Sequence, residues 1–453
     1  MIKDIIQFRN ELEKVNGWWI NKRVGEAEKY PFKRNLFSEI EKEISTRRII
    51  CLLGTRRTGK TILLKQLIQS LIKTEPRNVL YYSMDDPSLF VFSDNLLKDL
   101  IEYWSENIAG EGKKYVFLDE IHNYPEWHKW IKSYYDRSEI KFFLSGSSSL
   151  SLQKEANKFL RGRTTEFELF PLNFNEFLKL SNKKVKIPGD EFEMKKSWRG
   201  IKDTFNEYLL VGGFPEWFEL KGEEDSVDRW LNRLVLDIPK KAIYEDVAKI
   251  FGIKNLNILE AILSFIVANQ SRILAYETIN DIAKLDRETL INYISFLKNS
   301  YLIMEVLKYS KNIKESLKAK KKFLVVDQGL RNALLKDYEV KENNVGFLIE
   351  NVVGVHIFRM AKRNEAKFFY FRENGEIDFV IKFKGDLIPI EVKYKEHITN
   401  SDLRTLLKFV EKNKCKEGIV VTKNLMKEEK VGKCKIKYIP SWVFLLNEVF
   451  NKT

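Results

Sequence analysis

Short apolar runs alternate with amphipathic helical patterns through the first part of the chain. Apolar side chains at helical spacing mark the helices, of which residues 62–72 are the clearest. Five runs predict buried strands, at residues 48–53, 78–83, 115–119, 140–145 and 165–170. Strands that alternate with helices indicate parallel βαβ units with right-handed crossovers. We therefore predict an α/β domain over residues 1–170.

The pattern changes in the second part of the chain. Residues 171–250 are mainly helical, and Gly212-Gly213 marks a turn within them. Residues 251–340 predict a winged helix, because three helices there precede two strands around a lysine-rich turn. These elements are helices 258–267, 277–284 (before the N-cap Asp286) and 289–299, strands 301–309 and 322–326, and the turn 311–321.

The last segment, residues 341–453, predicts a second α/β domain. A helix at 346–360 precedes the strands, and the strands are expected at 368–372, 376–383, 387–394 and 418–422. A two-residue hairpin turn at Lys384-Gly385 would connect the second and third of these strands.

The composition of the chain has an excess of basic residues. The chain has 78 basic and 64 acidic residues, a net charge of +14 and a pI near 9.2. Such an excess favours anionic partners, nucleic acid first. A solvated surface rich in ion pairs, as in a thermophile, is the alternative explanation.

The cysteines and the hydropathy of the chain argue against a disulfide-stabilised or membrane-spanning protein. Cys51, Cys415 and Cys434 show neither metal-type spacing nor a disulfide framework. No apolar run reaches the ~18 residues that a membrane span needs, and no N-terminal signal pattern is visible. The sequence therefore predicts a cytoplasmic protein with no membrane partner.

A phosphate-binding loop follows the first predicted strand. The segment GTRRTGKT matches G-x-x-x-x-G-K-[ST], in which backbone N–H groups and a helix N-terminus face the phosphates. Lys60 is expected to reach the β- and γ-phosphates of ATP, and Thr61 to ligate Mg²⁺. The predicted residues that bind ATP or ADP are Gly54, Thr55, Arg56, Arg57, Thr58, Gly59, Lys60 and Thr61.

Two carboxylates end the third predicted strand. Asp119 follows an apolar run, where a carboxylate beside the phosphate-binding loop holds the magnesium shell. Glu120, directly after it, is the predicted general base that activates the attacking water.

Further catalytic candidates follow the next strand. Ser145, or else Ser147, would sense the γ-phosphate, although a simple strand-exit turn is the alternative. Arg161 and Arg163 precede the fifth strand, and either would neutralise transition-state charge in cis or from a neighbouring subunit. A pair of surface arginines is the competing interpretation.

The C-terminal segment carries a second constellation. A hairpin turning at Lys384-Gly385 sets Asp378 directly opposite Glu391, and Glu391 shares one strand face with Lys393. Facing carboxylates repel unless a cation lies between them, and oxygen ligands suit Mg²⁺ or Mn²⁺. Lys393 would orient or activate a metal-bound water.

Several segments together resemble an AAA-type ATPase family of archaea and bacteria, whose C-terminal part is catalogued as a domain of unknown function. They are GTRRTGKT, LDEIHNYPEWHKWIK, SGSSS, LRGR, FPLNFNEF, LVGGFPEW and VVDQGL, and the resemblance covers nearly the whole chain. It implies a P-loop NTPase of the additional-strand class, with parallel sheet order 5-1-4-3-2. AAA-type proteins often form rings, so the resemblance also implies a homo-oligomer.

The D…ExK set of Asp378, Glu391 and Lys393 resembles the PD-(D/E)xK nuclease fold, with Ile377 in place of the usual proline. In that fold a glutamate of the preceding helix joins the metal site, and Glu350 occupies the matching position. The resemblance implies a Mg²⁺ or Mn²⁺ site at Glu350, Asp378 and Glu391 that cleaves phosphodiesters. A salt-bridged hairpin without metal, or a fold that binds nucleic acid without cutting it, stays open.

A winged helix offers a way to hold DNA. Its third helix, around residues 287–298, would enter the major groove, although much of that helix is apolar and suits a core. Six lysines would contact phosphates, namely Lys311, Lys314, Lys318, Lys320, Lys321 and Lys322. Winged helices also serve as contacts for proteins or as lids.

These features predict an ATP-driven machine that acts on nucleic acid, with domains at residues 1–170, 171–250, 251–340 and 341–453. The alternative is a nucleotide-dependent switch or scaffold with protein partners and an inactive nuclease-like domain. A DNA-binding regulator with slow turnover is a third interpretation.

Overall fold

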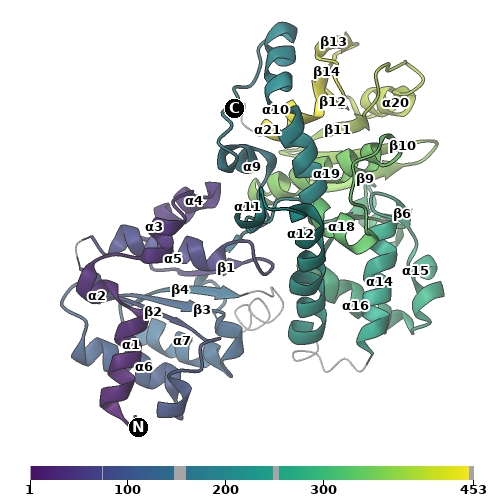
Figure 1. The fold of residues 1–453 in the computed structure, drawn as a ribbon. Helices are drawn as coiled ribbons and strands as arrows, with labels where there is room; N and C mark the ends of the chain where they lie inside the picture. The colour runs from purple at the N-terminus through teal and green to yellow at the C-terminus, as the bar shows by residue number, and fades with distance from the viewer. Residues whose placement is uncertain (1, 74, 147–159, 248–254, 448–453) are drawn as a thin grey trace. The chain divides into compact units, whose positions relative to one another are not determined.

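The computed structural model describes residues 2–73, 75–146, 160–247 and 255–447. The chain divides into two compact units, Met1–Phe170 and Pro171–Thr453, each built around its own sheet (Figure 1). Among the described helices, none combines the length and hydropathy that a membrane crossing requires.

The first unit contains a five-stranded sheet whose strands all run parallel. Read from one edge to the other, it consists of β2 (Val79–Ser83), β3 (Tyr115–Asp119), β4 (Lys141–Gly146), β1 (Ile49–Leu53) and β5 (Thr164–Glu168). This is the order 5-1-4-3-2 read from the opposite edge. The predicted P-loop NTPase fold of the additional-strand class is therefore confirmed.

Buried apolar stripes pack the helices of this unit. In α6, for example, Leu97, Leu100 and Trp104 recur at helical spacing and are fully buried. The helices are α1 (Ile5–Val15), α2 (Trp18–Asn21), α3 (Gly25–Lys29), α4 (Asn35–Glu43), α5 (Lys60–Leu71), α6 (Leu96–Asn107) and α7 (Trp127–Arg137).

The N-terminal segment covers the open edge of β2. The Asn16 side chain accepts a hydrogen bond from Tyr81 N (2.7 Å) and donates one to Tyr81 O (3.1 Å), as a neighbouring strand would. The indoles of Trp18 and Trp19 both donate to Val79 O. An exposed strand edge invites pairing with other chains, so these side chains close a surface that would otherwise aggregate.

The second unit contains a nine-stranded mixed sheet. In order across the sheet, its strands are β13 (Lys427–Val431), β14 (Cys434–Pro440), β12 (Glu417–Thr422), β11 (Asp386–Lys393), β10 (Glu376–Phe383), β9 (Lys367–Arg372), β7 (Ile303–Lys308), β8 (Lys321–Val325) and β6 (Ile273–Leu274). β7 pairs with β9 in parallel, through Leu307 with Phe369 and Lys308 with Tyr370. The segments predicted as separate domains at residues 251–340 and 341–453 thus share one continuous sheet.

Twelve described α-helices accompany this sheet. They are α9 (Phe174–Leu180), α10 (Glu191–Val211), α11 (Trp217–Leu220), α12 (Ser226–Val235), α14 (Leu256–Ala268), α15 (Tyr276–Ala283), α16 (Arg287–Asn299), α17 (Ile313–Lys318), α18 (Gln328–Leu335), α19 (Glu342–Arg363), α20 (Arg404–Asn413) and α21 (Ser441–Leu446). Two π-helical segments, Leu236–Lys240 and Ala242–Val247, follow α12. Asp286 caps α16 as predicted, since its side chain accepts from Thr289 N at 2.9 Å.

The lysine-rich connection between β7 and β8 differs from the sequence expectation of a plain turn. It contains the short helix α17, which begins where the Asn312 side chain accepts from Lys314 N. Asparagine is a preferred N-cap, so the local sequence favours this helical turn.

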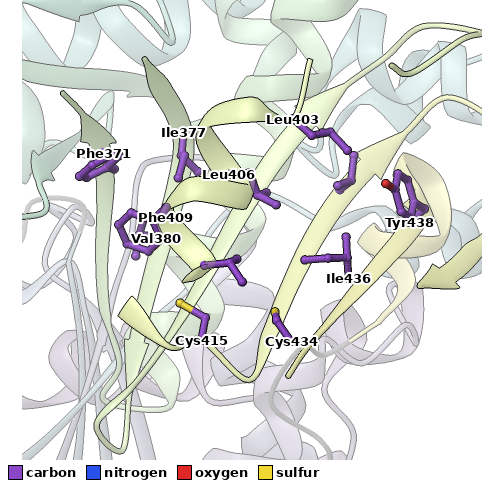
Figure 2. Packing of buried hydrophobic residues seen from close by; sticks show 12 residues of the cluster. Phe371, Ile377, Val380, Leu403, Leu406, Phe409, Cys415, Cys434, Ile436 and Tyr438 are labelled. Atoms are coloured by element: carbon purple, nitrogen blue, oxygen red, sulfur yellow. The ribbon is translucent and has the colours of Figure 1, made fainter. Parts of the chain in front are cut away.

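The predicted hairpin register is confirmed. Phe379 pairs with Ile390 and Phe383 with Asp386, and the turn residues Lys384 and Gly385 have positive φ angles of 47° and 91°. Behind this hairpin, an apolar cluster joins β10, β12, β14 and α20 (Figure 2). Ile377, Phe409 and Ile436 lie within it, and they fix the hairpin against the helix.

We predict that Asn16→Ala lowers the free energy of unfolding by about 1–3 kcal/mol, because it leaves the buried N–H of Tyr81 without its partner. Urea unfolding measures this change. Asn10→Ala on the exposed face of α1 is the matched control and should change stability by less than about 0.5 kcal/mol. Equal effects of the two substitutions would contradict the edge-covering role of Asn16.

Candidate functional site

The phosphate-binding loop leaves β1 through a backbone that only glycine accommodates. Gly54 has a φ of +146°, and a Cβ there would lie 2.2 Å from Leu169 O. That close approach exists because Leu169 N donates to Leu53 O at 2.7 Å. Gly59, with φ of +91°, then turns the chain into α5. The helix N-terminus, with its positive dipole end, faces the loop.

Lys60 is the first residue of α5 and is 4% exposed. Its ammonium donates to Gly54 O at 2.9 Å and to Thr55 O at 3.1 Å. Thr58 stiffens the same loop, since its hydroxyl donates to Thr55 O. The ammonium is therefore held inside the curve of the loop, where a phosphate group would receive it.

Asp119 is the buried centre of the site. Its Oδ2 accepts from the Thr61 hydroxyl at 2.6 Å and from the Tyr81 hydroxyl at 3.1 Å, and its Oδ1 accepts from the Ser145 hydroxyl. Hydroxyl and carboxylate oxygens are ligands that Mg²⁺ prefers, so Thr61 and Asp119 fit this ion. The structure brings these two predicted ligands together.

Glu120 stands beside Lys60. Its backbone has a φ of +47° and its N–H donates to the Ser145 hydroxyl at 3.1 Å. One carboxylate oxygen lies 3.7 Å from Lys60 Nζ and the other 3.3 Å from His122 Nδ1. This places the Glu120 carboxylate beside the Lys60 ammonium, and its role as the general base stays a prediction.

Ser145 lies on β4, between β3 and β1, and is fully buried. Because its hydroxyl bonds both Asp119 and Glu120 N, it positions these two residues. Its predicted role as a γ-phosphate sensor stays a prediction. The other candidate, Ser147, lies outside the described residues.

The two arginines lie near the amino end of β5, at the opposite end of the strands from the loop. Thr164, directly after Arg163, pairs with Ile49 at the start of β1, whereas the loop follows the end of that strand. Roughly 16 Å of strand therefore separate them. Arg163 instead pairs with Asp136 at 3.2 Å. The prediction that Arg161 or Arg163 acts in cis is wrong, because neither side chain spans that length, while a role from a neighbouring subunit stays a prediction.

Sequence reasoning missed three side chains near Asp119 and Glu120. Tyr81 bonds Asp119, and burial together with Asp119 raises the pKa of its phenol. The Lys65 ammonium lies 3.6 Å from the centre of the Tyr81 ring, and burial lowers its pKa. His122 faces Glu120. Successive side chains of a strand point to opposite faces of the sheet. The sequence of β2 could therefore have placed Tyr81 on the face covered by α5, where Lys65 lies.

A second cluster lies in the other unit, where α19, β10 and β11 bring the predicted residues together. Asp378 accepts from Val392 N at 2.8 Å, Lys393 pairs with Glu391, and Glu350 faces Asp378 from α19. The cluster also contains Lys322, which sequence reasoning assigned to DNA.

Electrostatics in this cluster are dominated by burial. Burial, reinforced by Asp378, raises the pKa of both Glu350 and Glu391. Burial alone would lower the pKa of Lys322, but Glu350, Asp378 and Glu376 together raise it. The Lys322 ammonium contacts Glu350 Oε1 at 2.9 Å and Glu376 Oε1 at 2.8 Å.

The predicted metal set of Glu350, Asp378 and Glu391 is not formed. In the part of the chain that the structure describes, no group of three or more acidic, histidine or cysteine side chains has an arrangement that could hold a metal ion. The physical reason is the Lys322 ammonium, which lies between Glu350 and Asp378.

Two predicted phosphate contacts are also wrong. Lys322 is fully buried, and Lys321 is 5% exposed with its ammonium bonded to Ser316 O and Leu317 O. The other four lysines of the set are exposed, namely Lys311, Lys314, Lys318 and Lys320.

The sheet order and the loop between β1 and α5 define the first unit as a P-loop NTPase. Family models agree with this class. Residues 46–178 match an AAA domain, and residues 202–340 and 345–443 match two domains of unknown function, DUF8612 and DUF4143.

Two proteins of Methanocaldococcus jannaschii are relatives over most of their length. The uncharacterized protein MJ1544 is 30% identical over 375 residues, which cover 80% of this chain and 78% of the relative. The uncharacterized protein MJ1637 is 28% identical over 446 residues, 92% of this chain and 89% of the relative. The chain belongs to the family of these archaeal proteins.

Solved structures include a similar chain, the Walker-type ATPase PABY2304 of Pyrococcus abyssi. It aligns with a TM-score of 0.41 at 16% identity, over 67% of this chain and 96% of that one.

We predict that Ser145→Ala lowers the rate of ATP hydrolysis by about 10- to 100-fold, because Asp119 and Glu120 lose the hydroxyl that orients them. Steady-state turnover measures the loss, and thermal unfolding checks that the variant is folded. Affinities for ATP and ADP should change equally. A selective loss of ATP affinity would instead assign Ser145 to the γ-phosphate.

Proposed function

We propose that this protein binds Mg-ATP and hydrolyses it, and that hydrolysis drives action on nucleic acid. One observation carries the first half of the proposal. Thr61, in the first turn of α5, and Asp119, at the end of β3, meet at 2.6 Å beside Lys60 and Glu120. This is the set of groups that phosphoryl transfer to water requires: an ammonium, two metal-ligand oxygens and a base.

The proposed steps follow from these contacts. Lys60 exchanges its bonds to neutral carbonyls for bonds to charged phosphate oxygens, which are stronger partners. When bound, Mg²⁺ neutralises charge on the β- and γ-phosphates. Glu120 accepts the proton of the attacking water, and His122 Nδ1 lies 3.3 Å from that carboxylate.

The nucleic-acid half of the proposal rests on residues 256–325. We interpret α14, α15 and α16 with β7 and β8 as a winged helix whose exposed lysines contact phosphates. Lys311, Lys314, Lys318 and Lys320 lie on α17 and its flanks, and all four are exposed. On α16, the exposed residues are Arg287, Glu288, Ile291 and Asn292.

A second candidate function is a nucleotide-dependent switch that acts on protein partners, with a nuclease-like domain that does not cut. The specific observation in its favour is Lys322, whose ammonium lies between Asp378 of the D…ExK set and Glu350 of α19. In both candidates an arginine from a neighbouring copy, Arg161 or Arg163, would complete the ATP site of a homo-oligomer.

We predict that Glu120→Gln keeps ATP bound but lowers hydrolysis by about 100-fold or more, because the amide cannot accept the water proton. Calorimetry and single-turnover rates separate the two effects. Lys60→Ala should lose nucleotide binding, whereas Lys73→Ala, an exposed lysine beyond the far end of α5, should retain it. Turnover at the wild-type rate would remove Glu120 from the base role.

We predict that duplex DNA binds in a salt-dependent manner. Changing Lys311, Lys314, Lys318 and Lys320 to Ala should weaken binding and flatten the dependence of log K on log salt by up to about 0.9 per lost phosphate contact. Fluorescence anisotropy across a salt series measures both quantities.

The matched control for that variant changes four exposed lysines elsewhere in the same unit, Lys408, Lys414, Lys430 and Lys433. Identical slopes for the two variants would mean that binding follows net charge alone. ATP turnover measured with and without DNA then separates the candidate functions, since only the first predicts stimulation.

A further inference from the structure

Lys322 lies in the interior of the nine-stranded sheet. It is on β8, where its backbone pairs with Ile273 of β6 and Val306 of β7, and its side chain is fully buried. The ammonium lies 5.3 Å from the centre of the Phe379 ring. A buried ammonium without partners is very costly, so the charged groups around it decide whether this strand can be in the core at all.

Three carboxylates from two other elements surround that ammonium. Glu350 of α19 lies at 2.9 Å, Glu376 of β10 at 2.8 Å and Asp378 of β10 at 3.6 Å. A divalent ion ligated by Glu350 and Asp378 would have to lie between them, about 2.0–2.6 Å from each oxygen. That space is already filled by a positive charge, and two cations at such a separation repel strongly.

We infer that Lys322 is a resident cation, which takes the place of a divalent metal among Glu350, Glu376 and Asp378. The cluster is then a metal-free joint that ties β8 to α19 and β10. Glu391, whose remaining oxygen Oε2 has no hydrogen-bond partner among the described residues, is balanced by Lys393. This inference stands independently of the proposed ATP and nucleic-acid functions.

A lysine in the place of a metal ion determines whether the C-terminal domain can cleave a phosphodiester. Hydrolysis of a phosphodiester at a D…ExK site needs a metal-bound water. Lys322 lies between Glu350 and Asp378, Asp378 Oδ2 accepts from Val392 N, and Glu391 pairs with Lys393, so these carboxylates are balanced by groups of the chain itself. The domain is therefore a non-cleaving one, and its acidic cluster serves packing between the strand pair β7–β8 and the α/β part.

Manganese binding to the nucleotide-free, full-length protein tests this inference. Electron paramagnetic resonance of Mn²⁺ counts bound ions in the wild type, in Asp378→Asn, in Lys322→Met and in Lys322→Met combined with Asp378→Asn. The wild type and Asp378→Asn should bind equally. Lys322→Met, which keeps the stem and removes the charge, should gain one site that the added Asp378→Asn abolishes.

The matched control is Lys320→Met, an exposed lysine two residues away, which should gain no Mn²⁺ site. Lys322→Met should also unfold at a lower temperature than the wild type, and Mn²⁺ should raise that temperature in this variant only. A wild-type Mn²⁺ site that Asp378→Asn abolishes would overturn the inference. This comparison needs no Lys322 variant, so it decides even if Lys322→Met fails to fold. Loss of ATP turnover is a separate readout and bears only on the proposed function.

Discussion

The contact between the Thr61 hydroxyl and the Asp119 carboxylate makes one site out of two separate chain segments. In the strand order of this sheet, β4 lies between β1, which leads into the loop, and β3, which ends at Asp119. The contact must therefore cross the end of β4. A small side chain is required there, and Ser145 supplies both the space and a hydroxyl that bonds Asp119 and Glu120 N. The proposed phosphate chemistry of the site depends on this contact between Thr61 and Asp119 across the end of β4.

Two buried lysines show why residue type alone does not determine function. Lys60 and Lys322 are both almost fully buried, yet their partners differ. Lys60 donates to two neutral carbonyls, which a charged phosphate displaces readily, and has a single carboxylate near it, Glu120 at 3.7 Å. Lys322 has three carboxylates around it, so no ligand offers it a better environment. Lys60 can therefore exchange its partners for a phosphate, whereas Lys322 is the cation that balances an acidic cluster.

The elements that sequence reasoning predicted well are those specified by local patterns. The loop follows from the residues Gly54–Thr61 themselves, and the 378–391 register follows from a two-residue turn and the period of a strand. The errors come from long-range pairing. A lysine-rich stretch looks solvated in sequence, but β8 pairs with β6 and β7, and this places Lys321 and Lys322 inside a sheet. Arg163 was misplaced for the same reason. Only the pairing of β5 with β1 reveals that Arg163 lies at the end of these strands opposite the loop.

The continuous sheet limits how the second unit can respond to a partner. Because β7 is hydrogen-bonded to β9, and Lys322 ties β8 to Glu350 and Glu376, the exposed lysines around α17 are fixed relative to α19 and β10. Hinge motion needs a few residues free to change φ and ψ, and a shared sheet offers none at this junction. A partner bound at α17 would therefore move with the whole nine-stranded sheet.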